Sequence, residues 1–346
     1  MKKTKTILLL FILCIGYFMY VQLFKQPALV AAEYMSLKQT YVHHSDDVWE
    51  VKFAPNDTLM VSGGLENNTK IWNRVTGKVL HNLPHEHGTP SVDFNPNGET
   101  VCTGSFDGKV RIWNVKTGQL QRVLEGGEDT IWSVTYSPDG KLLATGGNED
   151  TVSVWDTETG TLLHEFKDAE HNIWEVVFHP SGQLLAASGS DNAVRIYDLQ
   201  KGVLLETLVG HTYVPHGLDF SPNGNLLASG GDDKTVKIWN TKNWKLLHTL
   251  QGENEAIHSV VFIDNNRVIA GGTDKPLLGE FLEYHFDFTG YTQPIIATLW
   301  DVNAAKILQT ISSHTNDLNL GMDVSTNRQL VATPSDDKTI KIWEIH

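Results

Sequence analysis

Hydrophobic and polar residues alternate in short runs along most of the chain. The run Val48–Phe53 alternates with a period of two, and residues 142–147 form an apolar run that ends in Gly146-Gly147. Runs of this length and period predict short β-strands. Turn sequences such as Ser137-Pro138-Asp139-Gly140 separate them, because proline presets one backbone angle and glycine accepts a positive φ. The pattern therefore predicts an all-β body.

A strand ending in tryptophan or tyrosine recurs at near-constant spacing. Successive positions lie 41 to 43 residues apart, apart from one gap of 61, and they are Trp72, Trp113, Trp155, Tyr197, Trp239, Trp300 and Trp343. Each repeat contains four short strand patterns without helices between them, which predicts a four-stranded antiparallel sheet. A single sheet cannot cover both of its faces. Seven sheets arranged radially can, so we expect a seven-bladed β-propeller.

The repeats resemble the WD-repeat (WD40) family from about Tyr34 to the end of the chain. The family's dipeptide stands as Trp155-Asp156 and Trp300-Asp301, and its opening Gly-His as Gly210-His211. The last repeat stops after a third strand, and residues 36–42 resemble the missing fourth strand. We therefore expect residues 36–42 to pair with the last blade and close the ring, which removes an exposed strand edge.

The resemblance also implies a repeated hydrogen-bond network from histidine through serine or threonine to tryptophan, held by an aspartate. Its members are His211, Ser229, Asp233 and Trp239 in the fifth repeat, His314, Thr333, Asp337 and Trp343 in the last, and His85, Thr103, Asp107 and Trp113 in the second. A serine–histidine–aspartate set would otherwise suggest a hydrolase. A catalytic triad occurs once, however, whereas this set recurs in register with the fold, so we interpret it as structural.

The N-terminal segment has a different composition. The start, MKKTKT, is basic, and residues 7–24 form an 18-residue run without a charge. This pattern predicts an N-terminal hydrophobic helix over residues 1–33, serving as a membrane anchor or as a signal peptide cleaved near Ala32. A buried core helix is the alternative. The lysine distribution places the propeller, residues 34–346, outside the cytoplasm, periplasmic or extracellular.

Charge and composition exclude several classes of function. The chain carries 27 Lys and Arg against 41 Asp and Glu, and four of the lysines precede Glu33, so the body carries 23 − 41 = −18. An acidic body repels nucleic acid and favours a basic partner segment. The two cysteines offer no disulfide scaffold. His43-His44 and His85-Glu86-His87 are weak signals for metal, so we expect no metal ion and no cofactor.

One face of the propeller is expected to bind a partner. In this family the residue at the start of each first strand points to the channel mouth; here these are Trp49, Pro90, Trp132, Trp174, His216, His258 and Leu320. The loop between second and third strands adds Leu65, Phe106, Asn148, Ser190, Asp232, Thr273 and Asp336. Aromatic residues with polar neighbours are typical of binding hot spots. Alternatively, the tryptophans pack only against neighbouring blades.

The sixth repeat carries an insertion on the same face. Residues 276–295 interrupt it and include Phe281, Tyr284 and Phe286. Insertions into repeats map to loops on one face, which is often the binding face. We expect a hairpin or flap over the channel mouth, or alternatively a packed decoration of blade six.

The sequence as a whole predicts a non-enzymatic scaffold outside the cytoplasm that binds a protein or peptide at the channel mouth. One alternative is a structural subunit that assembles a membrane complex through its rim or underside. A second is a propeller hydrolase or metal-dependent enzyme with chemistry near His216, His258 and His285. The sequence leaves the oligomeric state open.

Overall fold

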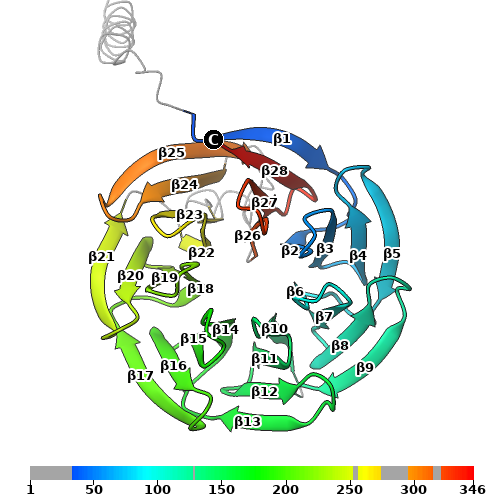
Figure 1. Cartoon of the computed structure of the whole chain (residues 1–346), viewed down its shortest axis with the longest axis horizontal. Coiled ribbons are helices and arrows are strands. Elements are labelled where there is room, and N and C mark those ends of the chain that lie inside the picture. The colour runs from blue at the N-terminus through cyan, green and yellow to red at the C-terminus, as the bar shows by residue number, and fades with distance from the viewer. Residues whose placement is uncertain (1–32, 128, 252–255, 274–294, 315–320) are drawn as a thin grey trace, which may run out of the picture. The chain divides into compact units, whose positions relative to one another are not determined.

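The computed structural model describes residues 33–127, 129–251, 256–273, 295–314 and 321–346. The chain divides into two units, Met1–Tyr34 and Met35–His346. In the second unit, seven four-stranded sheets surround a common centre (Figure 1). The expected N-terminal helix lies outside the described residues. Among the residues that are described, no helix is long and apolar enough to cross a membrane.

Each sheet is one blade, with its first strand at the centre of the ring. The first strands are β2 (Val48–Phe53), β6 (Ser91–Phe94), β10 (Ile131–Tyr136), β14 (Ile173–Phe178), β18 (Pro215–Phe220), β22 (Ala256–Phe262) and β26 (Asp323–Val324). The second strands are β3 (Leu59–Gly64), β7 (Thr100–Gly104), β11 (Leu142–Gly147), β15 (Leu184–Gly189), β19 (Leu226–Gly231), β23 (Arg267–Thr273) and β27 (Leu330–Pro334).

The outer half of each blade completes the sheet. The third strands are β4 (Asn68–Asn73), β8 (Lys109–Asn114), β12 (Val152–Asp156), β16 (Ala193–Asp198), β20 (Thr235–Asn240), β24 (Ile295–Asp301) and β28 (Ile340–Ile345). The fourth, outermost strands are β5 (Lys78–Pro84), β9 (Leu120–Glu125), β13 (Leu162–Phe166), β17 (Val203–Val209), β21 (Lys245–Gln251), β25 (Lys306–His314) and β1 (Met35–Tyr41). All the strand pairs are antiparallel, as the repeat pattern predicts.

The hydrophobic pattern of each strand follows its distance from the centre. In β8 four consecutive residues are buried, because neighbouring blades cover both faces of this strand. In the outer strand β9 only Leu124 is buried. The core therefore lies between blades: Val152, Phe166, Ile173 and Tyr197 form one such cluster, with residues from the third and fourth blades. Burial of these side chains against one another is the main stabilising term.

The two ends of the chain meet in one blade. β1 pairs with β28 from Met35 opposite Ile345 to Tyr41 opposite Ile340, where the sequence predicted residues 36–42. Tyr41 and Ile342 then pack with Trp72 and Phe53 of the next blade in one cluster. The last blade thus receives its fourth strand from the start of the propeller, and the ring has no open edge between its ends.

Side chains on the first strands join each blade to the next. The Glu50 carboxylate accepts the Val92 N–H at 2.7 Å, the Ser133 hydroxyl accepts the Val176 N–H at 3.1 Å, and Asp323 accepts the Phe53 N–H at 2.7 Å. Similar bonds use Ser91, Asp93, Glu175, Asp219 and Ser259. The inner edge of each first strand has no neighbouring strand, so these side chains satisfy backbone donors that would otherwise lack a partner.

Between the last blade and the first, backbone hydrogen bonds add to the bond that Asp323 accepts from Phe53. Gly321 N–H donates to the Trp49 carbonyl at 3.0 Å, and the Val51 N–H donates to the Gly321 carbonyl at 3.2 Å. A Cβ atom on Gly321 would lie 2.2 Å from Glu50 Cγ, so only glycine allows the approach.

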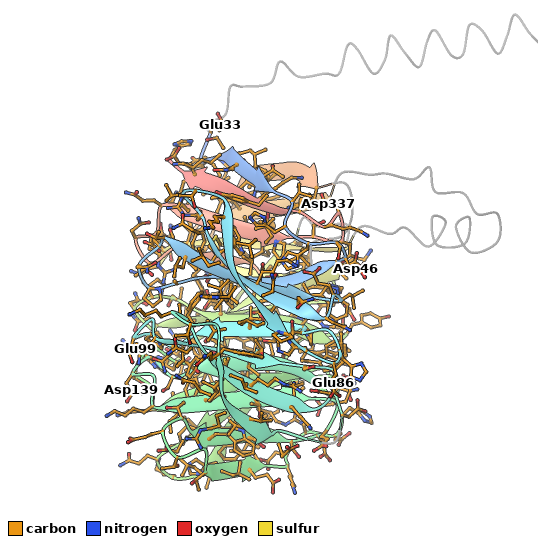
Figure 2. The ribbon with its side chains drawn as sticks, turned by 90° about the vertical axis from the view of Figure 1, so that its right-hand side faces the viewer. Glu33, Asp46, Glu86, Glu99, Asp139 and Asp337 are labelled. Carbon is orange, nitrogen blue, oxygen red and sulfur yellow. The ribbon has the colours of Figure 1, made fainter. Side chains whose placement is uncertain are left out.

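The loops fall on two opposite faces of the ring. Asp46 and Glu86 precede first strands, and Asp337 lies between β27 and β28; all three lie on one face (Figure 2). Glu99 and Asp139 lie in turns between first and second strands, on the other face. The loops entering the first strands and the loops between second and third strands therefore share one face, which we call the mouth face.

Candidate partner-binding face

A β-bulge near the start of the first strand shapes the mouth face. The register shifts between Val48 and Glu50 in β2, and equivalent shifts occur in β10, β14, β18 and β22. A bulge leaves the extra residue without a partner and re-aims its side chain. The residues at these shifts are Trp49, Trp132, Trp174, His216 and His258. The predicted rim residues of five blades therefore share one local backbone irregularity.

Their rings form a continuous arc. Trp49 stacks on Trp132 with ring centroids 5.8 Å apart, and Phe106 contacts both edge-on at 5.5 and 5.7 Å. Trp132 contacts Trp174 at 5.2 Å, and Trp174 contacts His216 at 4.8 Å. His258 extends the arc, 4.6 Å from His216. Six of the predicted site residues thus lie in one surface, with aromatic contacts of favourable geometry.

Polar loop residues hold the rings in place. The Trp174 indole N–H donates to the Ser190 hydroxyl at 2.8 Å, and the Trp132 indole N–H donates to the Asn148 side-chain carbonyl. Each tryptophan is partly buried, so its ring has both a packing contact and an exposed portion. The sequence left two interpretations of these tryptophans, packing against neighbouring residues and exposure at the mouth, and both describe Trp132 and Trp174. An aromatic surface that is already oriented loses little conformational entropy on binding.

Part of the predicted face lies outside the described residues. This applies to Leu320 and to Phe281, Tyr284 and Phe286 of the insertion, and to His285, so the flap at residues 276–295 remains an expectation. Two further residues of the mouth face are exposed, of which Leu65 was predicted from its loop position and Tyr213 was not. Tyr213, in the loop before β18, is 64% exposed, and Leu65 is 37% exposed. Tyr213 could have been found from its place beside the Gly-His dipeptide.

Acidic side chains surround the aromatic part of the arc. Asp129, Glu149, Asp150 and Glu170 are exposed in the loops around Trp132 and Trp174. The Thr130 N–H donates to Asp129, and this hydrogen bond holds the pKa of the Asp129 carboxyl below its usual value. A face with oriented rings and ionised carboxylates is complementary to a basic, partly apolar segment.

Below the mouth, charged side chains line a central cavity of about 140 Å³. Lys52 projects into it, 3.1 Å from a Glu50 oxygen. Burial works to lower the pKa of Lys52, but the carboxylates of Glu50, Asp323 and Asp93 outweigh it and the pKa is raised. Burial raises the pKa of Asp93 and of Asp219 to about 7. Because these carboxylates accept backbone N–H groups of the next blade, we assign them to the joining of blades.

At the other end of the arc, three possible ligands lie together. His216 Nε2 lies 3.1 Å from Asp232 Oδ1, and His258 Nε2 lies 3.6 Å from the same oxygen. Burial lowers the pKa of His216. Burial would raise the pKa of Asp232, but the two imidazoles beside it hold it well below its usual value.

The buried histidine networks lie apart from this surface. His211 Nε2 is 2.7 Å from the Ser229 hydroxyl, which accepts the Trp239 indole N–H at 2.9 Å, and His211 Nδ1 is 3.0 Å from Asp233. In the last blade, the His314 ring lies 2.8 Å from the Thr333 hydroxyl and 3.0 Å from Asp337, and the Trp343 indole donates to Thr333 at 3.0 Å. Ser229 is fully buried, so no substrate reaches its hydroxyl as in a hydrolase.

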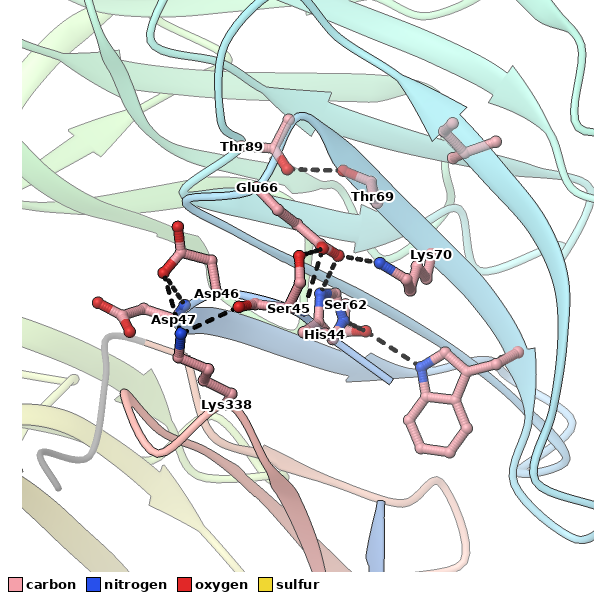
Figure 3. A network of polar contacts seen from close by, with 12 residues as sticks. His44, Ser45, Asp46, Asp47, Ser62, Glu66, Thr69, Lys70, Thr89 and Lys338 are labelled. Atoms are coloured by element: carbon pink, nitrogen blue, oxygen red, sulfur yellow. Dashed lines mark hydrogen bonds and ion pairs between the residues drawn. The ribbon is translucent and has the colours of Figure 1, made fainter. Parts of the chain in front are cut away.

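The first blade has a variant of this network that the sequence analysis missed (Figure 3). His44 contacts the Ser62 hydroxyl at 2.6 Å, Trp72 donates to the same hydroxyl at 3.1 Å, and Glu66 takes the place of the aspartate on His44 Nδ1. Glu66 also pairs with Lys70. The signal was the acidic residue four positions before a basic one, as in Asp107–Arg111, Asp191–Arg195, Asp233–Lys237 and Asp337–Lys341.

The second blade departs from the expected network. His85 Nε2 contacts the Thr103 hydroxyl at 2.9 Å and the Trp113 indole donates to it at 3.0 Å, but His85 Nδ1 meets the Leu83 carbonyl at 2.9 Å. Asp107 pairs with Arg111 instead, at 2.6 Å. The expectation that Asp107 holds His85 was therefore wrong, because the nearby arginine takes the carboxylate.

The comparison with protein-family models agrees with this architecture. The model described as WD domain, G-beta repeat (WD40) matches residues 35–73, 77–114, 118–156, 160–198, 202–240 and 305–344. The chain belongs to the WD40 family. A search of curated proteins found no match.

Each WD40 match spans two blades. Residues 35–73, for example, run from β1, the outer strand of the last blade, through β4 of the first. The WD40 sequence unit thus begins with the outer strand of one blade and continues through the first three strands of the next. In the first match that outer strand is β1, which pairs with the last blade and closes the ring. The unmatched stretch, 241–304, includes the sixth blade's first three strands and its insertion.

Proposed function

We propose that this propeller is a non-enzymatic scaffold that binds a protein or peptide on its mouth face. The observation that carries the proposal is the continuous arc from Trp49 to His258, whose rings are oriented and whose three tryptophans are partly exposed. WD40 propellers commonly serve as interaction scaffolds, so the family supports the same class of function. The exposed carboxylates beside the arc favour a basic partner segment.

The test replaces Trp132 and Trp174 together by alanine. Peptides would be selected from a displayed library on the immobilised wild-type propeller, and their affinities measured for both proteins. Because aromatic anchors dominate binding energy, we expect a loss of at least about 30-fold, corresponding to about 2 kcal/mol. A selection enriched in lysine and arginine supports the charge argument.

The matched control replaces Leu162 and Leu205 together by alanine. These residues lie on the outer strands β13 and β17 and are 41% and 43% exposed. The control variant should leave the affinities unchanged. If the selected peptides bind the double tryptophan variant as tightly as the wild type, the mouth face is not the binding surface.

A second candidate function rests on the outer rim. Apolar side chains are exposed on the outer strands of all seven blades: Leu37, Leu80, Leu120, Leu162, Leu205, Leu246 and Ile307. Such a band suits a structural subunit that assembles a complex through its rim. Loss of peptide binding or of co-purifying subunits in the leucine control variant, with the tryptophan variant unaffected, would favour this function.

We also propose that the scaffold works outside the cytoplasm, on an anchor or after cleavage of a signal. The support is the basic start and the uncharged run over residues 7–24. Protease added to cells stripped to an intact cytoplasmic membrane should digest a propeller outside it, and full protection that is lost on lysis of that membrane would contradict this location.

A further inference from the structure

Three potential metal ligands from two blades converge at the histidine end of the arc. His216 lies at the bulge of β18, His258 at the bulge of β22, and Asp232 directly follows β19. One ligand atom from each lies within 4.8 Å of the others. Among the described residues, the two blades whose bulge tryptophan bonds to a polar loop residue, Trp132 with Asn148 and Trp174 with Ser190, offer no such set.

The distances between these ligand atoms are close to those expected around one tetrahedral metal ion. Ligands 2.0–2.2 Å from a tetrahedral ion lie roughly 3.3–3.6 Å apart. The two imidazole nitrogens lie 3.1 and 3.6 Å from Asp232 Oδ1. The 3.1 Å separation also suits an N–H···O hydrogen bond, whereas 3.6 Å is too long for a good one. The carboxylate oxygen therefore sits between two ring nitrogens at spacings that an ion would satisfy together.

We propose that His216, Asp232 and His258 form a binding site for one divalent transition-metal ion of the zinc class. Two imidazole nitrogens and one carboxylate oxygen are ligands that Zn²⁺, Co²⁺ and Ni²⁺ prefer, whereas Ca²⁺ and Mg²⁺ require mostly oxygen. Three protein ligands leave a fourth position open for water or an external ligand.

The surroundings of the three ligand side chains leave them accessible to solvent and restrict the His216 ring. The His216 side chain is 10% exposed, His258 22% and Asp232 37%, which gives an ion a path from solvent. Trp174 packs on His216 and restricts its ring. The site stands independently of the peptide-binding proposal.

The test uses the chelator-treated full chain and two probes, Zn²⁺ and Co²⁺. Calorimetric titration with Zn²⁺ should show one tight site, and Co²⁺ should give the intense visible absorption of a tetrahedral complex. Asp232→Asn keeps the side-chain shape but weakens the ligand, and His258→Ala removes one. Each should weaken the Zn²⁺ affinity at least about tenfold and remove the tetrahedral cobalt spectrum.

A control variant and a Tm measurement distinguish loss of the metal site from loss of folding and from binding of the ion to other surface histidines. His248→Ala, in outer strand β21, is the matched histidine control and should bind both ions as the wild type does. Zn²⁺ should raise the Tm of the wild type and of His248→Ala, since an ion that binds only the native state stabilises it, and should raise the Tm of Asp232→Asn less at the same Zn²⁺ concentration. Equal Zn²⁺ affinity in Asp232→Asn and the wild type, or no tight site in the wild type, would overturn the proposal.

Discussion

At the residue scale, one position decides whether the buried aromatic ring of a blade has a hydrogen-bond partner. The position lies on the second strand, opposite the third-strand residue that comes two positions before the tryptophan or tyrosine. Its occupants are Ser62, Thr103, Thr145, Ala187, Ser229, Ala270 and Thr333. The five hydroxyl residues accept an indole N–H. In the two blades with alanine, the Tyr197 hydroxyl and the Trp300 Nε1 are buried without a partner among the described residues.

Ala270→Ser should therefore stabilise the propeller. The new hydroxyl can accept the Trp300 N–H, and a buried hydrogen bond contributes about 0.5–1.5 kcal/mol. Chemical denaturation would measure the free energy of unfolding. The matched control, Ala228→Ser, places a hydroxyl at a buried alanine one residue before Ser229 and should destabilise. If both variants lose stability equally, Trp300 does not use the new hydroxyl.

At the element scale, the paired strands β1 and β28 join the start and end of the propeller. Ser36 lies opposite Glu344 in this pairing, whereas Leu37 lies opposite Trp343. Directly opposed residues point to the same face, and a shift of one residue reverses the face. The register of the closure is therefore measurable with pairs of cysteines.

Ser36→Cys combined with Glu344→Cys should form a disulfide under mild oxidation, in a Cys14→Ser background. Opposed residues in an antiparallel pair have Cα atoms about 4.5–5.5 Å apart, within the range of a disulfide. Electrophoresis without reductant would show the circular chain. Leu37→Cys with Glu344→Cys is the control and should remain reduced; equal yields for both pairs would contradict this register.

At the scale of the whole molecule, acidic side chains from several blades gather in and beside the central cavity, with Asp219 lining it and Asp93 close enough to act on Lys52. Asp93 and Asp219 each accept a backbone N–H of the next blade, and burial raises the pKa of each to about 7. The unfolded chain releases these protons near pH 4. Between about pH 4 and 7 the native state holds more protons, so these two groups favour the fold most below pH 4 and lose that contribution as the pH rises to about 7.

The double variant Asp93→Asn and Asp219→Asn should not show this fall in folding stability as the pH rises. Relative to the variant, the wild type should become less stable between pH 4 and 7, by at most about 4 kcal/mol for each carboxyl, and by less because solvent in the cavity screens the charge. Denaturation at several pH values measures the difference. Asp139→Asn is the control, since hydrogen bonds from Ser137 and Lys141 lower the pKa of Asp139 and the trend should be opposite in sign. A pH-independent difference for the double variant would contradict the assignment.

The sequence by itself determined the architecture, because each blade repeats one local pattern. The period of the tryptophans, the alternation in the strands and the glycine-containing turns depend on neighbours within about 42 residues, and they predicted seven blades and the closure. The rim position was also predictable, since a repeat carries each first-strand residue to an equivalent place in the ring.

Only the tertiary structure decided which of these positions act together. The contact between Trp49 and Trp132 joins residues of the first and third blades, and the approach of His258 to Asp232 joins the sixth and fifth. The use of Glu66 by His44, and of Asp107 by Arg111 rather than His85, likewise depended on side-chain reach. Repetition specifies equivalent positions, whereas distances between unlike side chains in different blades are set by ring packing and by the bulges.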